Sequence, residues 1–287
     1  MMRIFRILIL GGTGDSARLI PQLAALPNVE LISSLAGRTP KPNIPNVGKV
    51  RMGGFGGVDG LGNYLRTEKI DLLLDMTHPF AAQITHNASI AAQCVGIPRL
   101  VFCRPAWEKE AGDRWITAMD HTAAATLIPE IADRVFLTIG RQELSAFATV
   151  VNCWFLMRMI TLPPNTMPQP PGEILLDQGP FDLDKETQLL IHYNIGAIVS
   201  KNSGGSAAQA KIVAARHLGL PIIMIPRPEL PDGEVVSDLE AIVPWVECQI
   251  RSLGSLALVP LGGMNRPKCS SSKDNSDFEG KSLKSLP

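Results

Sequence analysis

Short apolar runs alternate with amphipathic stretches along most of this chain of 287 residues. A short apolar run that ends in glycine or polar residues is typical of a strand buried on both faces, and the amphipathic stretches have the period of helices. Strands that alternate with helices form β-α units, which assemble into a parallel sheet covered by helices. The sequence therefore predicts an α/β protein.

The alternation starts twice, which predicts two domains. In the first series the expected strands are 6–10, 29–33, 49–52, 71–75 and 99–103, and the expected helices are 15–26, 58–67 and 81–95. In the second series the expected strands are 115–118, 135–139, 154–159, 197–200 and 221–225, and the expected helices are 121–131, 142–149, 185–193, 206–218 and a closing 238–250. We expect two Rossmann-like domains whose parallel sheets flank a central cleft. Residues 1–105 form the dinucleotide-binding domain, residues 106–250 complete the cleft, and the hinge lies near 104–113.

Two segments depart from this alternation. Residues 162–172 contain five prolines, which predicts an extended loop that borders the cleft. Residues 270–287 are rich in serine and lysine and have few large apolar side chains, so we expect 251–287 to be a disordered tail.

The composition excludes several kinds of partner. The 27 basic and 27 acidic residues cancel. This argues against binding to nucleic acid or to a membrane surface, because proteins that bind either one rely on a broad positive potential. No apolar run is long enough to cross a membrane. The five cysteines include no C-x-x-C pair, which indicates thiols in a reducing cytoplasm and no metal site.

The first expected strand runs into a glycine-rich loop, Gly11-Gly12-Thr13-Gly14-Asp15, that opens a helix. Read from Gly12 to Ala17, its spacing is G-x-G-x-x-A, the pattern of a dinucleotide fingerprint. Glycines allow the backbone to approach a pyrophosphate, and the helix N-terminus supplies N–H groups and partial positive charge. No Gly-Lys-Ser/Thr follows, so the loop is not a P-loop.

The next two strand ends bear on the choice of cofactor. In most NAD-binding folds an acidic residue ends the second strand and binds the ribose hydroxyls. Here that strand leads through Ser33 and Ser34 to Arg38, which suits a phosphorylated ribose and favours NADPH, although NADH stays open. The third strand leads to Gly53 and Gly54, which indicate either close approach to a ligand or a mobile loop.

The fourth strand ends in Thr77 and His78, at the edge where ligands bind in open α/β sheets. His78 could donate a proton near neutral pH. It could equally cap the following helix and bond to the backbone.

In the second domain, strand ends carry cations and amides. One strand leads to Arg141 and Gln142, and another runs through Ser200 into Lys201-Asn202-Ser203-Gly204-Gly205. Donors beside flexible backbone before a helix are typical of an anion site. With Arg104 and Trp107 at the hinge, these residues would line a cleft suited to a planar polyanion.

The loops, in their order and spacing, resemble the precorrin-6A reductase family of cobalamin biosynthesis, including the cobalt-precorrin-6A reductases. The resemblance covers about residues 5–250 and rests on Gly11-Gly12-Thr13, Leu35-Ala36-Gly37-Arg38, Gly53-Gly54-Phe55-Gly56-Gly57, Thr77-His78-Pro79-Phe80-Ala81, Arg104-Pro105-Ala106-Trp107, residues 138–142 and residues 200–205. It implies hydride transfer from NADPH or NADH to a ring double bond of precorrin-6A or cobalt-precorrin-6A, which gives the 6B product.

The resemblance also implies roles for residues of this chain. Cofactor binding falls to Gly11, Gly12, Thr13, Gly14, Asp15, Arg38, Gly53 and Gly54. The catalytic candidates are Thr77, His78 and Lys201, with His78, Lys201 or water as the proton donor. The tetrapyrrole would contact Arg104, Trp107, Arg141, Gln142, Lys201, Asn202 and Ser203.

Two other functions would share the first loop. A short-chain-type oxidoreductase should show Tyr-x-x-x-Lys, but Tyr64 is followed by Glu68 and Tyr193 by Ala197 at the lysine position. A non-catalytic nucleotide sensor would not need the donor-rich loops of the second domain. Both remain alternatives at the level of sequence.

Overall fold

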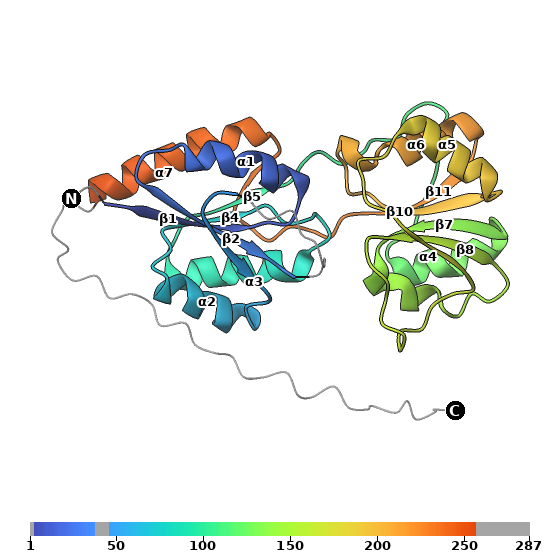
Figure 1. Cartoon of the computed structure of the whole chain (residues 1–287), viewed down its shortest axis with the longest axis horizontal. Coiled ribbons are helices and arrows are strands. Elements are labelled where there is room, and N and C mark those ends of the chain that lie inside the picture. The colour runs from blue at the N-terminus through green and yellow to red at the C-terminus, as the bar shows by residue number, and fades with distance from the viewer. Residues whose placement is uncertain (1–2, 38–45, 257–287) are drawn as a thin grey trace, which may run out of the picture.

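The computed structural model describes residues 3–37 and 46–256. These residues form two six-stranded sheets, and every pair of neighbouring strands in them is parallel. Figure 1 shows the two sheets side by side along the long axis, each covered by helices on both faces. This confirms the α/β fold class with two Rossmann-like units.

The first sheet has the strand order β12-β5-β4-β1-β2-β3. Its strands are β1 (Phe5–Leu10), β2 (Val29–Leu35), β3 (Lys49–Met52), β4 (Leu72–Asp75), β5 (Arg99–Phe102) and β12 (Glu234–Val236). The order reverses between β1 and β4, so the loops that follow these two strands diverge there. Ligands of open α/β sheets bind at such a switch point.

Helices cover both faces of the first sheet. One face packs against α1 (Gly14–Ala24) and α7 (Ile242–Leu256), and the other packs against α2 (Gly57–Thr67) and α3 (Ala82–Val95). Alternate residues of β1 point to opposite faces, so Ile7 and Ile9 join the α1 and α7 cluster while Leu8 and Leu10 join the other. The strand is apolar throughout because both faces are buried.

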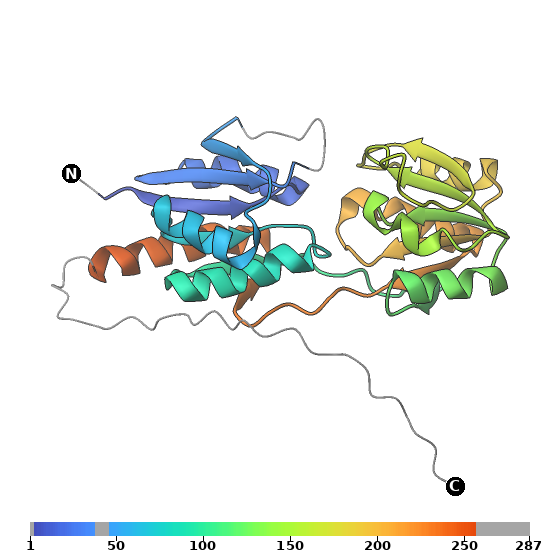
Figure 2. The ribbon, with the colours of Figure 1, turned by 90° about the horizontal axis from the view of Figure 1, so that it is seen from below.

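The end of the described chain returns to the first sheet, which corrects the expected domain boundary. We expected residues 106–250 to form one unit, but β12 pairs with β5, and Ile242 and Val246 of α7 are buried against β1 and α1. Figure 2 shows the two segments that join the units running close together. Residues 251–256 continue α7, contrary to the expected tail, and 257–287 lie outside the described residues.

The packing of α7 on the first unit can be tested at Val246, which is fully buried in that unit's core. We expect Val246→Ala to lower the free energy of unfolding by about 2 kcal/mol, through lost burial and the cavity left behind. Cys248→Ala on the exposed side of the same helix should change it by less than about 0.5 kcal/mol. Denaturant unfolding measures both, and equal effects would contradict the packing.

The second sheet has the order β6-β11-β10-β7-β8-β9. Its strands are β6 (Arg114–Thr117), β7 (Arg134–Thr138), β8 (Trp154–Met159), β9 (Gly172–Leu176), β10 (Ala197–Lys201) and β11 (Pro221–Ile225). Its α-helices are α4 (His121–Leu127), α5 (Leu183–His192) and α6 (Ala210–Leu218). Sequence analysis missed the edge strand β9, and the helix expected at 142–149 is the 3₁₀ helix η2 (Arg141–Phe147).

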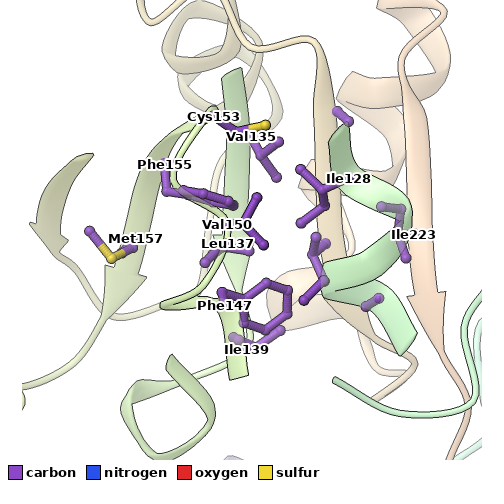
Figure 3. Packing of buried hydrophobic residues seen from close by; sticks show 14 of the residues in the cluster. Ile128, Val135, Leu137, Ile139, Phe147, Val150, Cys153, Phe155, Met157 and Ile223 are labelled. Atoms are coloured by element: carbon purple, nitrogen blue, oxygen red, sulfur yellow. The ribbon is translucent and has the colours of Figure 1, made fainter. Parts of the chain in front are cut away.

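The core of the second unit lies on both faces of its sheet. On the α4 face, β7 contributes Val135 and Leu137, and Ile139 directly follows the strand; all three are at most 1% exposed. Figure 3 shows these side chains gathered with Phe147, Ile128 and their neighbours between the sheet and the helices. This packing fixes β7 and β10, whose carboxyl ends carry the second unit's part of the site.

Candidate active site

The carboxyl edges of the two sheets meet at a cleft of about 410 Å³. The first unit contributes His78, Phe80 and Ala81 from the segment after β4. Most of the remaining wall comes from the ends of β7, β8 and β10 and from the segments that follow β7, β8, β9 and β10 in the second unit. Of the sequence-predicted substrate residues, the cleft brings together Arg141, Gln142, Lys201 and Ser203.

The glycine-rich loop lies beside the cleft, at the end of β1. Thr13 caps α1, since its hydroxyl accepts a bond from Ser16 N at 3.2 Å and donates to Met76 O at 3.0 Å. Gly12 has φ +101° with no atom within 4 Å of an added Cβ, whereas a Cβ on Gly11 would lie 3.2 Å from Ser16 Oγ. The loop therefore exposes backbone ahead of a helix N-terminus, which fits a dinucleotide pyrophosphate.

The loop after β3 is held by Arg51, a residue that sequence analysis did not select. Its guanidinium donates to the carbonyls of Gly53 and Gly54, both at 2.6 Å, and to Ser34 Oγ at 3.2 Å. It also lies 3.7 Å from the centre of the Phe55 ring. A cation thus stands between the ends of β2 and β3. Arg38, expected to bind the cofactor, lies outside the described residues.

Thr77 faces the interior of the first unit. Its hydroxyl donates to Asp75 Oδ1 at 2.7 Å, and its backbone N–H donates to the same oxygen at 3.1 Å. Asp75 is 1% exposed and ends β4. The expected catalytic role of Thr77 gains no support from this placement, because its side chain serves the turn that positions His78.

His78 lines the cleft as a neutral imidazole. Its Nδ1 accepts a hydrogen bond from Phe80 N at 3.2 Å, which leaves the ring proton on Nε2. Burial lowers the pKa of His78 to about 3, and the nearby cations Lys201, Arg104, Arg227 and Lys211 add to this effect. His78 can therefore donate a hydrogen bond at neutral pH but is not a stored imidazolium.

This placement makes folding sensitive to acid. An unfolded histidine has a pKa of about 6.5, so between pH 6.5 and 3 the unfolded chain binds more protons than the folded one. The contribution of neutral His78 to the free energy of unfolding is fully present above this window and is lost as pH falls through it. When the pH is lowered from 7 to 5.5, we expect the free energy of unfolding of the native chain to fall by about 1 kcal/mol more than that of His78→Gln.

Denaturant unfolding of His78→Gln, with exposed His192→Gln as the control, measures the acid effect. The His192 variant still contains His78, so its stability should keep the acid dependence that His78 causes in the native chain. An NMR titration of the His78 ring with a midpoint near 6.5 would contradict the assignment.

Lys201 projects from the end of β10 into the cleft. Its ammonium lies 3.3 Å from Glu143 Oε1 and 5.4 Å from the centre of the Phe80 ring, so it stands between η2 and the first unit. Its side chain is 15% exposed. Glu143, which sequence analysis missed, directly follows Gln142 in η2. The cation is thus positioned beside His78's segment and reachable from the cleft.

Three residues expected to contact substrate instead form a junction between the units. The side chain of Asn202 bonds the backbone of Trp107 in both directions, at 2.8 and 3.0 Å. Trp107 is 8% exposed, and its indole N–H donates to Gly205 O at 3.0 Å. Neither side chain lines the cleft, because both are used to bind the linker to the loop after β10.

Arg104 completes this junction. It donates to Ser203 O at 2.9 Å and forms an ion pair of 2.7 Å with Asp15 in the first turn of α1. Asp15, expected to bind cofactor, thus connects the glycine-rich loop to the second unit. Arg104 does not line the cleft.

Sequence analysis missed further charged residues that the cleft contains. Arg158 on β8 and Lys211 on α6 both line it. Their positions inside a strand and a helix carry no strand-end signal, so only the fold reveals them. Among the described residues, no group of three or more His, Cys, Asp or Glu is arranged to hold a metal. Every helix in those ranges is too short or too polar to cross a bilayer.

The fold and the site define an α/β enzyme of the dinucleotide-binding class, with a second α/β unit beside the sheet edge that carries the glycine-rich loop. A profile of the family described as Precorrin-6x reductase CbiJ/CobK matches residues 6–247. The chain belongs to this family.

Known relatives match this chain along most of their length. The precorrin-6A reductase of Rhodococcus erythropolis is 50% identical over 242 residues, which cover 84% of this chain and 97% of the relative. A solved structure of CobK precorrin-6A reductase is 38% identical with a TM-score of 0.79, over 86% of this chain and 98% of that one. The cobalt-precorrin-6A reductase of Methanothermobacter thermautotrophicus is 28% identical, over 80% of this chain and 79% of the relative.

Proposed function

We propose that this chain reduces a ring double bond of metal-free precorrin-6A to give precorrin-6B, with NADPH as the hydride donor. The observation that carries the proposal is the cleft between two sheet edges, one with a dinucleotide-type loop and the other lined by cations, in a member of this reductase family. Membership in a family of reductases favours this function over the nucleotide sensor and the short-chain oxidoreductase.

The cofactor assignment rests on the first sheet edge. Gly11, Gly12, Gly14 and the N-terminus of α1 would bind the pyrophosphate, and Thr13 fixes the loop by its two side-chain bonds. When bound, the nicotinamide supplies the hydride. NADPH is favoured because no acidic residue ends β2, while Arg51 places a positive charge beside Ser34.

The second sheet edge would bind the substrate and supply the proton. A carboxylated tetrapyrrole fits a cleft lined by Arg141, Arg158, Lys201 and Lys211. We assign the proton to Lys201, because its ammonium borders the cleft and His78 is uncharged at neutral pH. His78 then orients substrate or cofactor through its Nε2 hydrogen.

The choice of metal-free substrate rests on similarity. The relatives at 40 to 50% identity are named precorrin-6A reductase, whereas those named cobalt-precorrin-6A reductase are 28% identical. This difference supports the metal-free ring as the substrate.

The decisive experiment follows nicotinamide absorbance after precorrin-6A or cobalt-precorrin-6A is added with NADPH or NADH. We expect the highest kcat/KM for precorrin-6A with NADPH, and at least a tenfold lower kcat for Lys201→Met, since a positioned proton donor contributes roughly 100-fold or more. Absence of oxidation with all four pairs would overturn the proposed function. An unchanged Lys201→Met would overturn only the proton assignment.

A further inference from the structure

A buried charge cluster at the cleft has one more cation than anion. It consists of Arg158 on β8, Glu186 on α5 and Lys211 on α6, which are 7%, 3% and 4% exposed. Arg158 forms a two-bond ion pair with Glu186, in which NH2 lies 3.0 Å from Oε2. The one carboxylate of the cluster is therefore already bound by Arg158.

Lys211 is the cation left over. Within residues 3–37 and 46–256, its ammonium forms no ion pair and no hydrogen bond, and it lies 5.1 Å from the centre of the Trp107 ring. It is nevertheless part of the cleft wall. It also stands in the first turn of α6, where the helix dipole disfavours a cation. A buried ammonium in this setting is unfavourable until an anion reaches it.

The electrostatic environment agrees with a missing negative charge. Burial lowers the pKa of Lys211 to about 7, with further lowering by Arg158 and Lys201 and opposition from Glu186. His78, from the first unit, also interacts electrostatically with Lys211, whose charge helps to lower the pKa of His78. Lys201 differs from Lys211 because Glu143 already balances its charge.

The surroundings of Lys211 suit a carboxylate on a short apolar arm. Phe181 and Ala208 line the cleft together with Arg158 and Lys211. The ring of Phe181 is stacked on the Arg158 guanidinium at 3.6 Å, which holds the guanidinium in place. The dinucleotide-type loop does not line the cleft, so a cofactor phosphate is not the anion that this geometry favours.

We propose that Lys211, with Arg158 beside it, is a carboxylate-binding subsite that holds one acidic side chain of the tetrapyrrole. The inference rests on the proposed function, since it assigns a subsite for that substrate. One carboxylate neutralises the excess charge of the cluster, and Lys211 takes up a proton as it binds. A purely structural Lys211, held by Glu186, would make the opposite predictions for stability and affinity.

The experiment compares Lys211→Met with Lys185→Met, an exposed lysine on α5. We expect Lys211→Met to raise KM for precorrin-6A at least tenfold, to leave the nicotinamide Kd within twofold, and to melt no lower than the native chain. The Lys185 variant should match the native chain in all three. In the native chain kcat/KM should also fall as pH rises from 7 to 9, and this dependence should be absent from Lys211→Met.

Each result decides between the two roles. A KM within twofold of the native value overturns the subsite, as does a lower melting temperature accompanied by equal losses of substrate and nicotinamide affinity. If Lys211→Met does not fold, Lys211→Gln is judged by the same measurements, because both remove the charge. A native chain that does not reduce precorrin-6A overturns the proposed function instead.

Discussion

We expect Gly204→Ala to lower kcat/KM at least 100-fold, because an added Cβ would push the linker away from the loop after β10. Gly204 has φ +63°, and its Cβ would lie 2.0 Å from Pro105 O and 2.5 Å from a nitrogen of Arg227. Real Cβ atoms do not approach a backbone oxygen so closely, so one of the two segments must move. A displacement of about 1 Å at a catalytic site costs roughly 100-fold in rate.

Gly219 supplies a matched control for this substitution. It has φ +65°, but no atom lies within 4 Å of an added Cβ. Gly219→Ala thus has the same backbone strain, about 1 kcal/mol, without the collision. We expect it to keep kcat/KM within about threefold, as measured by nicotinamide oxidation and thermal unfolding. Similar activity losses in both variants would show that strain, and not the contact with Pro105, is responsible.

The sequence was sufficient for elements whose signal is local. Residues 49–52, 154–159 and 221–225 were predicted as strands with the bounds that the structure has. The second and third of these are short, mostly apolar runs, and the first leads directly into Gly53 and Gly54. Because parallel strands end at a common edge, the same reasoning placed His78 and Lys201 on the cleft.

The elements that were missed depend on distant partners. β12 has only three residues, and its partner strand β5 lies more than 100 positions earlier in the chain. Nothing in its sequence specifies which of two sheets it joins. β9 is an edge strand that follows a proline-rich loop and is largely exposed, so it lacks the apolar pattern of a buried strand. Pairing with β8 defines it.

Side-chain direction limited the prediction of the site. Asn202 and Trp107 belong to loops near the cleft, as expected, but the Asn202 side chain is hydrogen-bonded to the Trp107 backbone. Lys211 has the sequence context of an ordinary helix residue, and only the packing of α6 on the sheet buries it. A linear motif gives residue type and order, whereas burial and neighbours decide which groups a ligand can reach.

Arg227→Met should lower kcat/KM at least 100-fold and the free energy of unfolding by about 3 kcal/mol, since a charged donor contributes about 1.5 to 3 kcal/mol per bond and solvent replaces part of it. Its guanidinium donates to four carbonyls, those of Asn202, Ser203, Arg104 and Pro105, at 2.6 to 3.0 Å. Methionine keeps the apolar stem but satisfies none of these oxygens.

Arg114→Met is the control, because exposed Arg114 donates to one carbonyl, Gly219 O, at 2.9 Å. We expect activity within about twofold and a stability loss below about 1 kcal/mol for this variant. Activity assays and denaturant unfolding measure both substitutions. A native kcat/KM for Arg227→Met would mean that the junction does not position the cleft.

The double variant Gly204→Ala, Arg227→Met shows whether the two residues act on one structure. Both hold residues 202–205 against the linker, and an added Cβ at 204 would collide with Arg227 itself. Once the linker has moved, removing its hydrogen bonds costs little more. The combined loss in kcat/KM should therefore be clearly smaller than the product of the single losses, as expected for residues in direct contact. Independent losses would place their effects in separate steps of binding or reaction.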